Sequence, residues 1–161
     1  RNAGMFEQLT LARALHVLAL VHWLGGVAMV TLVILPAVRR FARPEDRLRL
    51  FEEVEGRFSG QAKISVTLAG LSGFYMTWLL EAWGRFLDPA FWWMHAMVLV
   101  WAIFTFVLFI GEPLFLHAWF HRKAEAAPEA TFRLVHRAHV VLLTASAITI
   151  GAAVLGAHGF L

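Results

Sequence analysis

The sequence predicts an all-α integral membrane protein, a bundle of four transmembrane helices in up-down-up-down order. Of its 161 residues, 60% are hydrophobic and only 16% are charged, whereas soluble domains carry about 25% charged residues. Apolar runs at 14–35, 64–80, 90–111 and 140–157 each approach the roughly 17–25 residues that cross a bilayer. The connections between these runs are short, which favours antiparallel packing of successive helices.

The first two helices are expected at residues 11–38 and 58–83. The segment between them, RRFARPEDRLRLFEEVEGRF, is too long and too charged for a tight turn. A proline followed by two acidic residues favours a helix start. We therefore expect a short amphipathic helix on the cytoplasmic surface, with Leu48 and Phe51 on its apolar face.

The second helix carries a stripe of small side chains. Ser65, Ala69 and Gly73 recur at intervals of four residues, which places them on one face of the helix. Small side chains at a helix interface let the two backbones approach closely. We therefore expect a neighbouring helix to pack against this stripe.

The third and fourth helices are expected at residues 90–120 and 129–155. Pro113 lies inside the third helix, where proline removes a backbone hydrogen bond and bends the helix. The four helices are expected to form one domain, residues 5–161. The four residues before Met5 are interpreted as an expression remnant.

The distribution of basic residues predicts the orientation in the membrane. Short basic connections remain in the cytoplasm, and the first and third connections are basic whereas the second has only Arg85. Both termini are therefore expected outside, in a bacterial inner (cytoplasmic) membrane. This asymmetry also accounts for the basic pI of about 10.2, so no nucleic-acid partner is expected. The cations concerned are Arg39, Arg40, Arg43, Arg47, Arg49, Arg57, Arg122, Lys123, Arg133 and Arg137.

The absence of cysteine limits the chemistry. Eight histidines but no cysteine occur in the chain, which excludes disulfides, thiolate metal sites and covalently attached c-type haem. Serine-nucleophile motifs, phosphate-binding loops and the zinc motif HExxH do not occur in the sequence either. If the protein is an enzyme, the remaining class is a membrane oxidoreductase.

Two histidines are predicted to lie at the same depth near the outer side. Counted from the outer side, His16 lies about five residues into the first helix and His95 about four residues into the third, within roughly 2 Å of one another along the axis. Facing imidazoles from different helices hold the iron of many haems, and bundle cores are common haem sites. We therefore expect His16 and His95 to be the axial ligands of a b-type haem, with Arg13 near a propionate.

The deeper histidines leave alternatives open. His22 lies roughly 9 Å below His16 and points about 120° away around the helix. It is expected to be a second ligand, a polar contact or a proton relay. His136 and His139 are three residues apart on one face near the cytoplasmic side, where they are expected to serve a second haem or a metal ion. The alternative for each histidine is a hydrogen bond to a neighbouring helix.

Other polar residues are expected at the cytoplasmic side. Glu112 is the one carboxylate deep in an apolar run, and it is expected to carry protons or to pair with Lys63. The alternative for Lys63 is that its ammonium group extends to the membrane surface. His117 and His121 share a face four residues apart and are expected to be solvated or to contact lipid headgroups.

Two short segments resemble a known group of membrane proteins. LHVLALVHWLGG, followed by PAVRR, resembles the first helix of the CopD group of copper-resistance proteins and of the related HemJ-type protoporphyrinogen oxidases. WWMHAM resembles the third-helix segment of the HemJ-type proteins, with Met97 where those proteins have lysine. His16 matches their haem-associated histidine of the first helix. The resemblance implies a compact four-helix membrane protein with intramembrane histidines.

Several functions are consistent with these features. The leading expectation is a haem-b-binding membrane protein in electron transfer or oxidoreduction, with one haem or two. The alternatives are a HemJ-type protoporphyrinogen IX oxidase, CopD-like copper transport or handling, and an accessory subunit whose histidines only pack. The expected partners are the lipid bilayer, a redox protein, and a second copy of the chain or a larger membrane complex.

Overall fold

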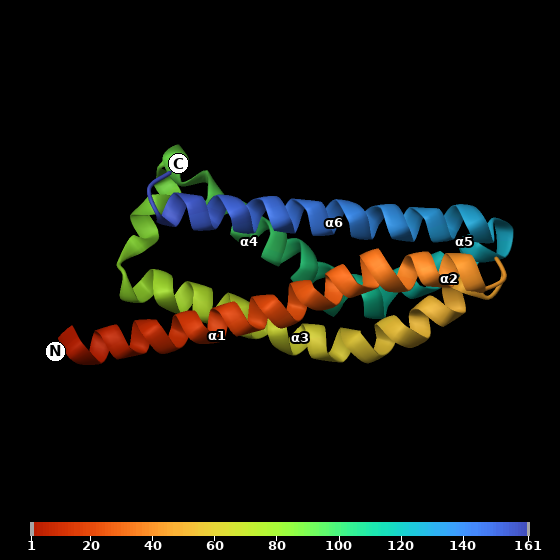
Figure 1. Cartoon of the computed structure of the whole chain (residues 1–161), viewed down its shortest axis with the longest axis horizontal. Helices are drawn as coiled ribbons and strands as arrows, with labels where there is room; N and C mark the ends of the chain where they lie inside the picture. The colour runs from red at the N-terminus through yellow and green to blue at the C-terminus, as the bar shows by residue number, and fades with distance from the viewer. Residues whose placement is uncertain (1, 161) are drawn as a thin grey trace.

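The computed structural model describes residues 2–160 and shows a helical protein, with no strand in that range (Figure 1). Its long helices are joined or interrupted by short π-helical and 3₁₀ segments. The elements in chain order are α1 (Asn2–Met29), the π-helix η1 (Val30–Ile34), α2 (Leu35–Phe41), α3 (Arg47–Leu79), the 3₁₀ helices η2 (Ala82–Leu87) and η3 (Pro89–Phe91), α4 (Trp92–Phe106), the π-helix η4 (Val107–Leu116), α5 (His117–Ala126) and α6 (Pro128–Ala157).

Three helical segments are long and apolar enough to cross a membrane: Gly4–Phe41, Pro89–Ala126 and Pro128–Ala157. Only 17% to 28% of the residues in their most apolar stretches are buried inside the protein. The remaining apolar side chains face outward, and so large an apolar surface is unstable in water. The chain is therefore a helical membrane protein.

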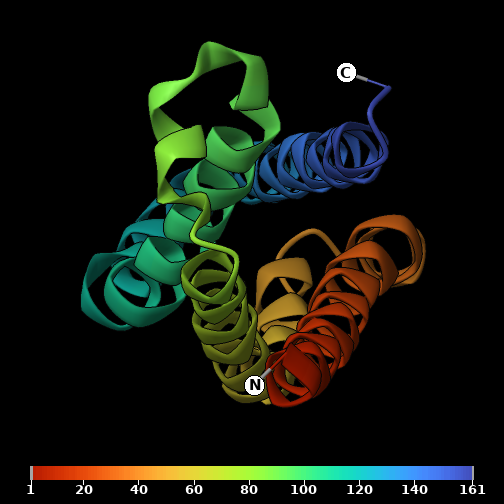
Figure 2. The ribbon, with the colours of Figure 1, turned by 90° about the vertical axis from the view of Figure 1, so that its left-hand side faces the viewer.

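The helices lie nearly parallel to one long axis, and the two termini lie at the same end of the molecule (Figure 1). The opposite end, which we call the basic end, contains the ends of α2 and α5 and the starts of α3 and α6. Viewed along the axis, α1 lies beside α3, and α4 lies beside α6 (Figure 2). These are also the two most extensive contacts between long helices.

The contact between α1 and α3 uses the predicted small-residue stripe. Ser65 and Ala69 are buried, and the ring of His16 from α1 lies beside Gly73. The expectation of close packing at this stripe is confirmed. The apolar core at this level contains Ala19, Trp23, Val27, Val66, Ala69 and Phe104.

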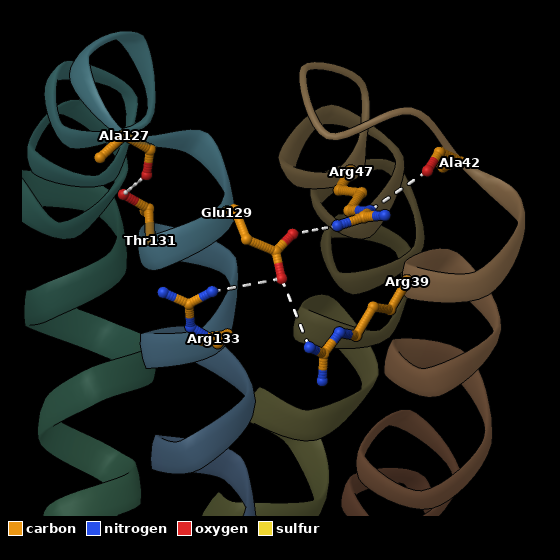
Figure 3. Close-up of polar contacts among 7 residues, drawn as sticks. All are labelled: Arg39, Ala42, Arg47, Ala127, Glu129, Thr131 and Arg133. Carbon is orange, nitrogen blue, oxygen red and sulfur yellow. Dashed lines mark hydrogen bonds and ion pairs between the residues drawn. The ribbon is translucent and has the colours of Figure 1, made fainter.

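At the basic end, one carboxylate joins three helices. Glu129 near the start of α6 forms ion pairs with Arg47 of α3, with Arg39 of α2 at 3.5 Å and with Arg133 one turn along α6 at 3.5 Å (Figure 3). Arg47 also donates a hydrogen bond to the carbonyl of Ala42 at 3.1 Å. Because the Arg47 side chain is only 14% exposed, this pair is less screened than surface ion pairs, which contribute about 0–1 kcal/mol.

The structure corrects one feature of the predicted fold. The expected separate amphipathic surface helix does not form, because α3 is continuous from Arg47 to Leu79. No proline interrupts this stretch, and a glycine such as Gly56 costs a helix only about 0.5–1 kcal/mol. Leu48 and Phe51, expected on the membrane surface, are instead buried in an apolar cluster that includes Phe132 of α6.

The predicted disturbance at Pro113 is confirmed, and it takes the form of a π-helix. Wide turns extend over Val107–Leu116, directly before α5. Proline has no N–H to donate, and π-helical turns occur frequently at functional sites. A π-turn adds residues relative to an α-helix, so η4 sets the rotation of α5 and the direction in which His117 and His121 point.

Candidate functional site

The polar side chains of the other long helices converge on α3. This helix has buried hydroxyl groups at Ser59, Ser65 and Ser72. It is less apolar than the three segments that are long and apolar enough to cross a membrane. Polar atoms in an apolar environment are costly unless they are hydrogen-bonded, and α3 supplies these partners. Among the side chains that contact it through polar atoms are His16, His22, Glu112, His117, His121 and His139.

At the basic end, two histidines and one carboxylate form a cluster, which we call the Glu52 cluster. One oxygen of Glu52 lies 3.4 Å from Nδ1 of His117, and its other oxygen lies 3.0 Å from Nε2 of His121. The two imidazole rings are 4.6 Å apart. All three ligand atoms lie within 4.8 Å of one another. Glu52 comes from α3 and both histidines from α5.

This geometry suits a transition-metal ion. In a tetrahedral site with metal–nitrogen bonds of 2.0–2.1 Å, neighbouring ligand atoms are about 3.4 Å apart. The two Glu52 distances involve different carboxylate oxygens, and with one ligand atom from each residue all three atoms lie within 4.8 Å of one another. Nitrogen and carboxylate ligands of this type bind zinc, iron and copper(II). The side chains of His117 and His121 are 64% and 49% exposed, so an ion can reach them. Three protein ligands leave a coordination position for water or for another molecule.

A second polar group lies further along α3. Nε2 of His139 lies 3.7 Å from a carboxylate oxygen of Glu55. Ser59 donates a hydrogen bond to Glu112 at 2.6 Å, and the ammonium group of Lys63 lies 3.8 Å from the same carboxylate oxygen. The pairing of Lys63 with Glu112, one of the two alternatives expected from the sequence, is therefore present.

Glu55 is placed where a negative charge is unfavourable. Burial, together with the neighbouring charges of Glu112 and Glu52, raises the pKa of Glu55 from 4.5 to about 8. Its carboxyl group lies on the part of α3 near the basic end, before the apolar stretch of that helix. At neutral pH it is protonated.

Replacing Glu55 with glutamine is expected to change how stability depends on pH. Between pH 4.5 and about 8 the unfolded chain loses the Glu55 proton and the folded protein keeps it. The free energy of unfolding of the wild type therefore falls as pH rises through this window. Because glutamine does not titrate, the melting temperature of Glu55→Gln, measured in mild detergent, should rise relative to wild type across the same range. The control Glu53→Gln, at an exposed carboxylate paired with Arg49, removes no buried carboxyl group and should not show this rise.

The two histidines expected to face one another across a haem have different partners. Nδ1 of His16 lies 2.9 Å from the carbonyl of Ala69 and 3.1 Å from the hydroxyl of Ser72. Nε2 of His95 lies 2.9 Å from the carbonyl of Phe86, and Nδ1 of the same ring lies 3.3 Å from that of Phe91. Within residues 2–160, no hydrogen bond or aromatic contact joins His16 to His95.

Three other residues predicted from the sequence, His22, His136 and Arg13, lie outside the Glu52 cluster. His22 lies 2.7 Å from the hydroxyl of Ser65 and 3.2 Å from the side-chain oxygen of Gln61, which is one of its expected roles, a polar contact. His136 is half-buried, and among the residues that the structure describes it forms no hydrogen bond or ion pair. Arg13 is exposed, and the same part of the chain offers it no carboxylate partner.

Sequence reasoning did not find the Glu52 cluster. The spacing of His117 and His121 was visible, but it indicated only a shared face. Their third ligand lies 65 residues earlier than His117 (117 − 52), on a different helix. The sequence signal nearest to the pair is Pro113, which lies in the π-helix before it. That proline does not indicate which helix faces the two histidines.

Comparison with protein-family models, curated protein sequences and solved structures gives no significant match for this chain.

Proposed function

We propose that this protein binds and handles a divalent transition-metal ion at the cytoplasmic end of a membrane-spanning helical bundle. The observation that supports it is the convergence of Glu52, His117 and His121 from two helices, with their ligand atoms within 4.8 Å. Among the described residues it is the one group of three histidine or acidic side chains close enough to hold an ion.

The proposal includes an orientation in the membrane. The apolar part of α3 is the fourth crossing, which completes an up-down-up-down bundle with the basic end in the cytoplasm and both termini outside. In support, Arg39 and Arg47 meet Glu129 and Arg133 at the basic end, and basic connections remain on the cytoplasmic side. The membrane proposed is the bacterial inner membrane.

The ligand types favour particular metals. Imidazole and carboxylate suit zinc, iron(II) and copper(II), whereas copper(I) prefers thiolate and thioether ligands. Affinities at such sites rise toward copper(II) along the first-row series. Of the functions expected from the sequence, the handling of copper in its divalent form agrees best with this site.

Metal titration of the full chain in mild detergent tests the proposal. Cobalt(II) serves as a coloured probe, and zinc and copper(II) are added in competition. We expect one ion per chain, with visible absorption bands typical of nitrogen and oxygen ligands and with displacement by copper(II) and by zinc. Absence of saturable binding by all three ions would refute the proposal.

A second candidate, haem-b binding with electron transfer or oxidoreduction, is favoured by His16. A metal-ligating histidine usually donates its other ring N–H to a carbonyl, and Nδ1 of His16 has such a partner in Ala69. Its Nε2 has no partner among the described residues. The HemJ-type oxidase activity belongs to this candidate, and the ability of the gene to restore growth of a strain without protoporphyrinogen oxidase tests that activity.

The absorption spectrum of the purified protein tests haem binding. If haem b is present, a Soret band is expected, together with separate α and β bands that become sharp on dithionite reduction. His16→Ala should then remove or shift these bands, whereas His158→Ala, at an exposed histidine at the C-terminal end of α6, should leave them unchanged. A colourless protein that binds stoichiometric copper would exclude this candidate and support the first.

A further inference from the structure

A hollow lies between α5 and α6 at the basic end. It has a volume of about 440 Å³, within the range of ligand pockets. Two cations, Arg122 and Lys123, are part of its wall, and none of its lining residues is acidic. The full lining is Trp119, Arg122, Lys123, Ala126, Ala127, Ala130, Thr131 and Leu134.

The cations of this hollow differ from those around Glu129. The guanidinium groups of Arg39, Arg47 and Arg133 share a carboxylate. Within residues 2–160, Arg122 and Lys123 have no acidic partner within ion-pair distance. The ammonium group of Lys123 instead lies 4.4 Å from the centre of the Trp119 ring, a cation–π contact. The hollow therefore has an uncompensated positive charge.

Apart from Thr131, the remaining wall is apolar, and it lies at the boundary of the two apolar helical segments. Leu134 is 40% exposed and Trp119 is 36% exposed, and tryptophan is enriched at the boundary between hydrocarbon and headgroups. The hollow also lies at the turn between two apolar segments, Pro89–Ala126 and Pro128–Ala157. Basic pockets between helices on the cytoplasmic side are typical sites for anionic lipid headgroups.

We propose that the hollow between α5 and α6 binds the headgroup of an anionic phospholipid. Arg122 and Lys123 contact the phosphate, and Trp119 and Leu134 contact the glycerol and the first acyl carbons. The occupant is a lipid rather than a free phosphate ion, because cationic and apolar side chains line the same space. This site is separate from the Glu52 cluster and does not depend on it.

Fluorescence quenching by brominated lipids tests the proposal on the full chain in mild detergent. Bromine on the acyl chains quenches nearby tryptophans, and the difference between wild type and Trp119→Phe isolates the signal of Trp119. We expect dibromo-phosphatidylglycerol to quench Trp119 at a concentration several-fold lower than dibromo-phosphatidylcholine. Arg122→Gln should reduce this preference about 5-fold, since each cation near an anionic surface contributes about 1 kcal/mol.

A matched variant and two competing ligands complete the experiment. Arg137→Gln removes a cation from the same end but outside the hollow, and it should retain the preference for phosphatidylglycerol. Metal binding at the Glu52 cluster, or an unchanged circular dichroism spectrum, shows that Arg122→Gln remains folded. Equal quenching by both lipids would overturn the proposal. Protection of Trp119 by inorganic phosphate alone, or protection that rises with protein concentration, would also overturn it, because the occupant would then be free phosphate or a second copy.

Discussion

Replacing His121 with alanine is expected to reduce the affinity for a divalent transition metal by more than about 100-fold. Loss of a residue that only hydrogen-bonds to a metal ligand typically lowers metal affinity 10–100-fold. His121 is itself a ligand in the proposed site, so its loss should have a larger effect. Its Nε2 is the nitrogen closest to Glu52, at 3.0 Å. Without it, two ligands remain, and water has to fill the vacated position. Cobalt(II) absorption and calorimetric titration with zinc measure the change.

The other two ligands and one neighbour test whether the three residues act together. Glu52→Gln and His117→Ala should each weaken binding to a similar degree, because all three ligand atoms lie within 4.8 Å of one another. His136→Ala is the matched control: a half-buried histidine of the same end that lies outside the cluster. It should bind metal as the wild type does.

This comparison also separates two locations for the metal. The sequence placed a metal near His136 and His139, whereas the structure brings His117 and His121 to Glu52. If His136→Ala abolished binding while His121→Ala retained it, the Glu52 cluster would not be the site. Binding should also weaken at acidic pH, because protons compete with metal for imidazole and carboxylate ligands.

Replacing Gly70 with alanine is expected to destabilise the protein by about 1–3 kcal/mol, the usual cost of inserting a methyl group into a packed interface. A Cβ atom at Gly70 would lie 2.6 Å from three atoms of the Trp101 indole. The indole cannot move freely, since its N–H donates a hydrogen bond to the carbonyl of Val66 at 2.9 Å. Its ring also meets that of Phe74 edge-on at 5.5 Å.

A second glycine on the same helix is the control. A Cβ atom at Gly60 would have no neighbour within 4 Å, so Gly60→Ala should be neutral or stabilise α3 by up to about 1 kcal/mol. Unfolding in mild detergent, followed by circular dichroism, measures both variants. Equal effects at Gly70 and Gly60 would show that the contact with Trp101 does not limit α3 packing.

A double variant isolates the steric cause. In a Trp101→Leu background the indole is absent, so adding Gly70→Ala should lower the free energy of unfolding little further than Trp101→Leu alone does. The difference between the two backgrounds measures the coupling between the residues. If Gly70→Ala lowered the free energy of unfolding as much in the Trp101→Leu background as in the wild type, alanine would be disturbing α3 itself.

Much of the fold follows from local pattern. Apolar runs predicted the long helices, and the interval of four between Ser65, Ala69 and Gly73 predicted the face of α3 on which a neighbouring helix packs. Pro113 predicted the irregular third helix. The separate surface helix was wrong because Leu48 and Phe51, which read equally well as membrane-facing, are buried beside Phe132. An amphipathic pattern indicates that a face is covered, but it does not indicate by what.

The candidate site was less predictable. Depth along the axis placed His16 and His95 level, and in the structure each ring contacts a different backbone carbonyl, that of Ala69 or that of Phe86. Rotation of the helices about their axes decides which side chains meet. That rotation depends on packing and on irregular turns such as η4, which sequence periodicity does not encode.

By itself, the sequence determined that this is a helical membrane protein with basic connections and polar side chains in apolar helices, because hydropathy and charge act residue by residue. Only the tertiary structure decided which polar groups meet. It made α3 their common partner and joined Glu52 to His117 and His121, two helices apart in the chain. The physical reason is that a buried polar atom needs a partner, and the partner available depends on which helix faces lie together.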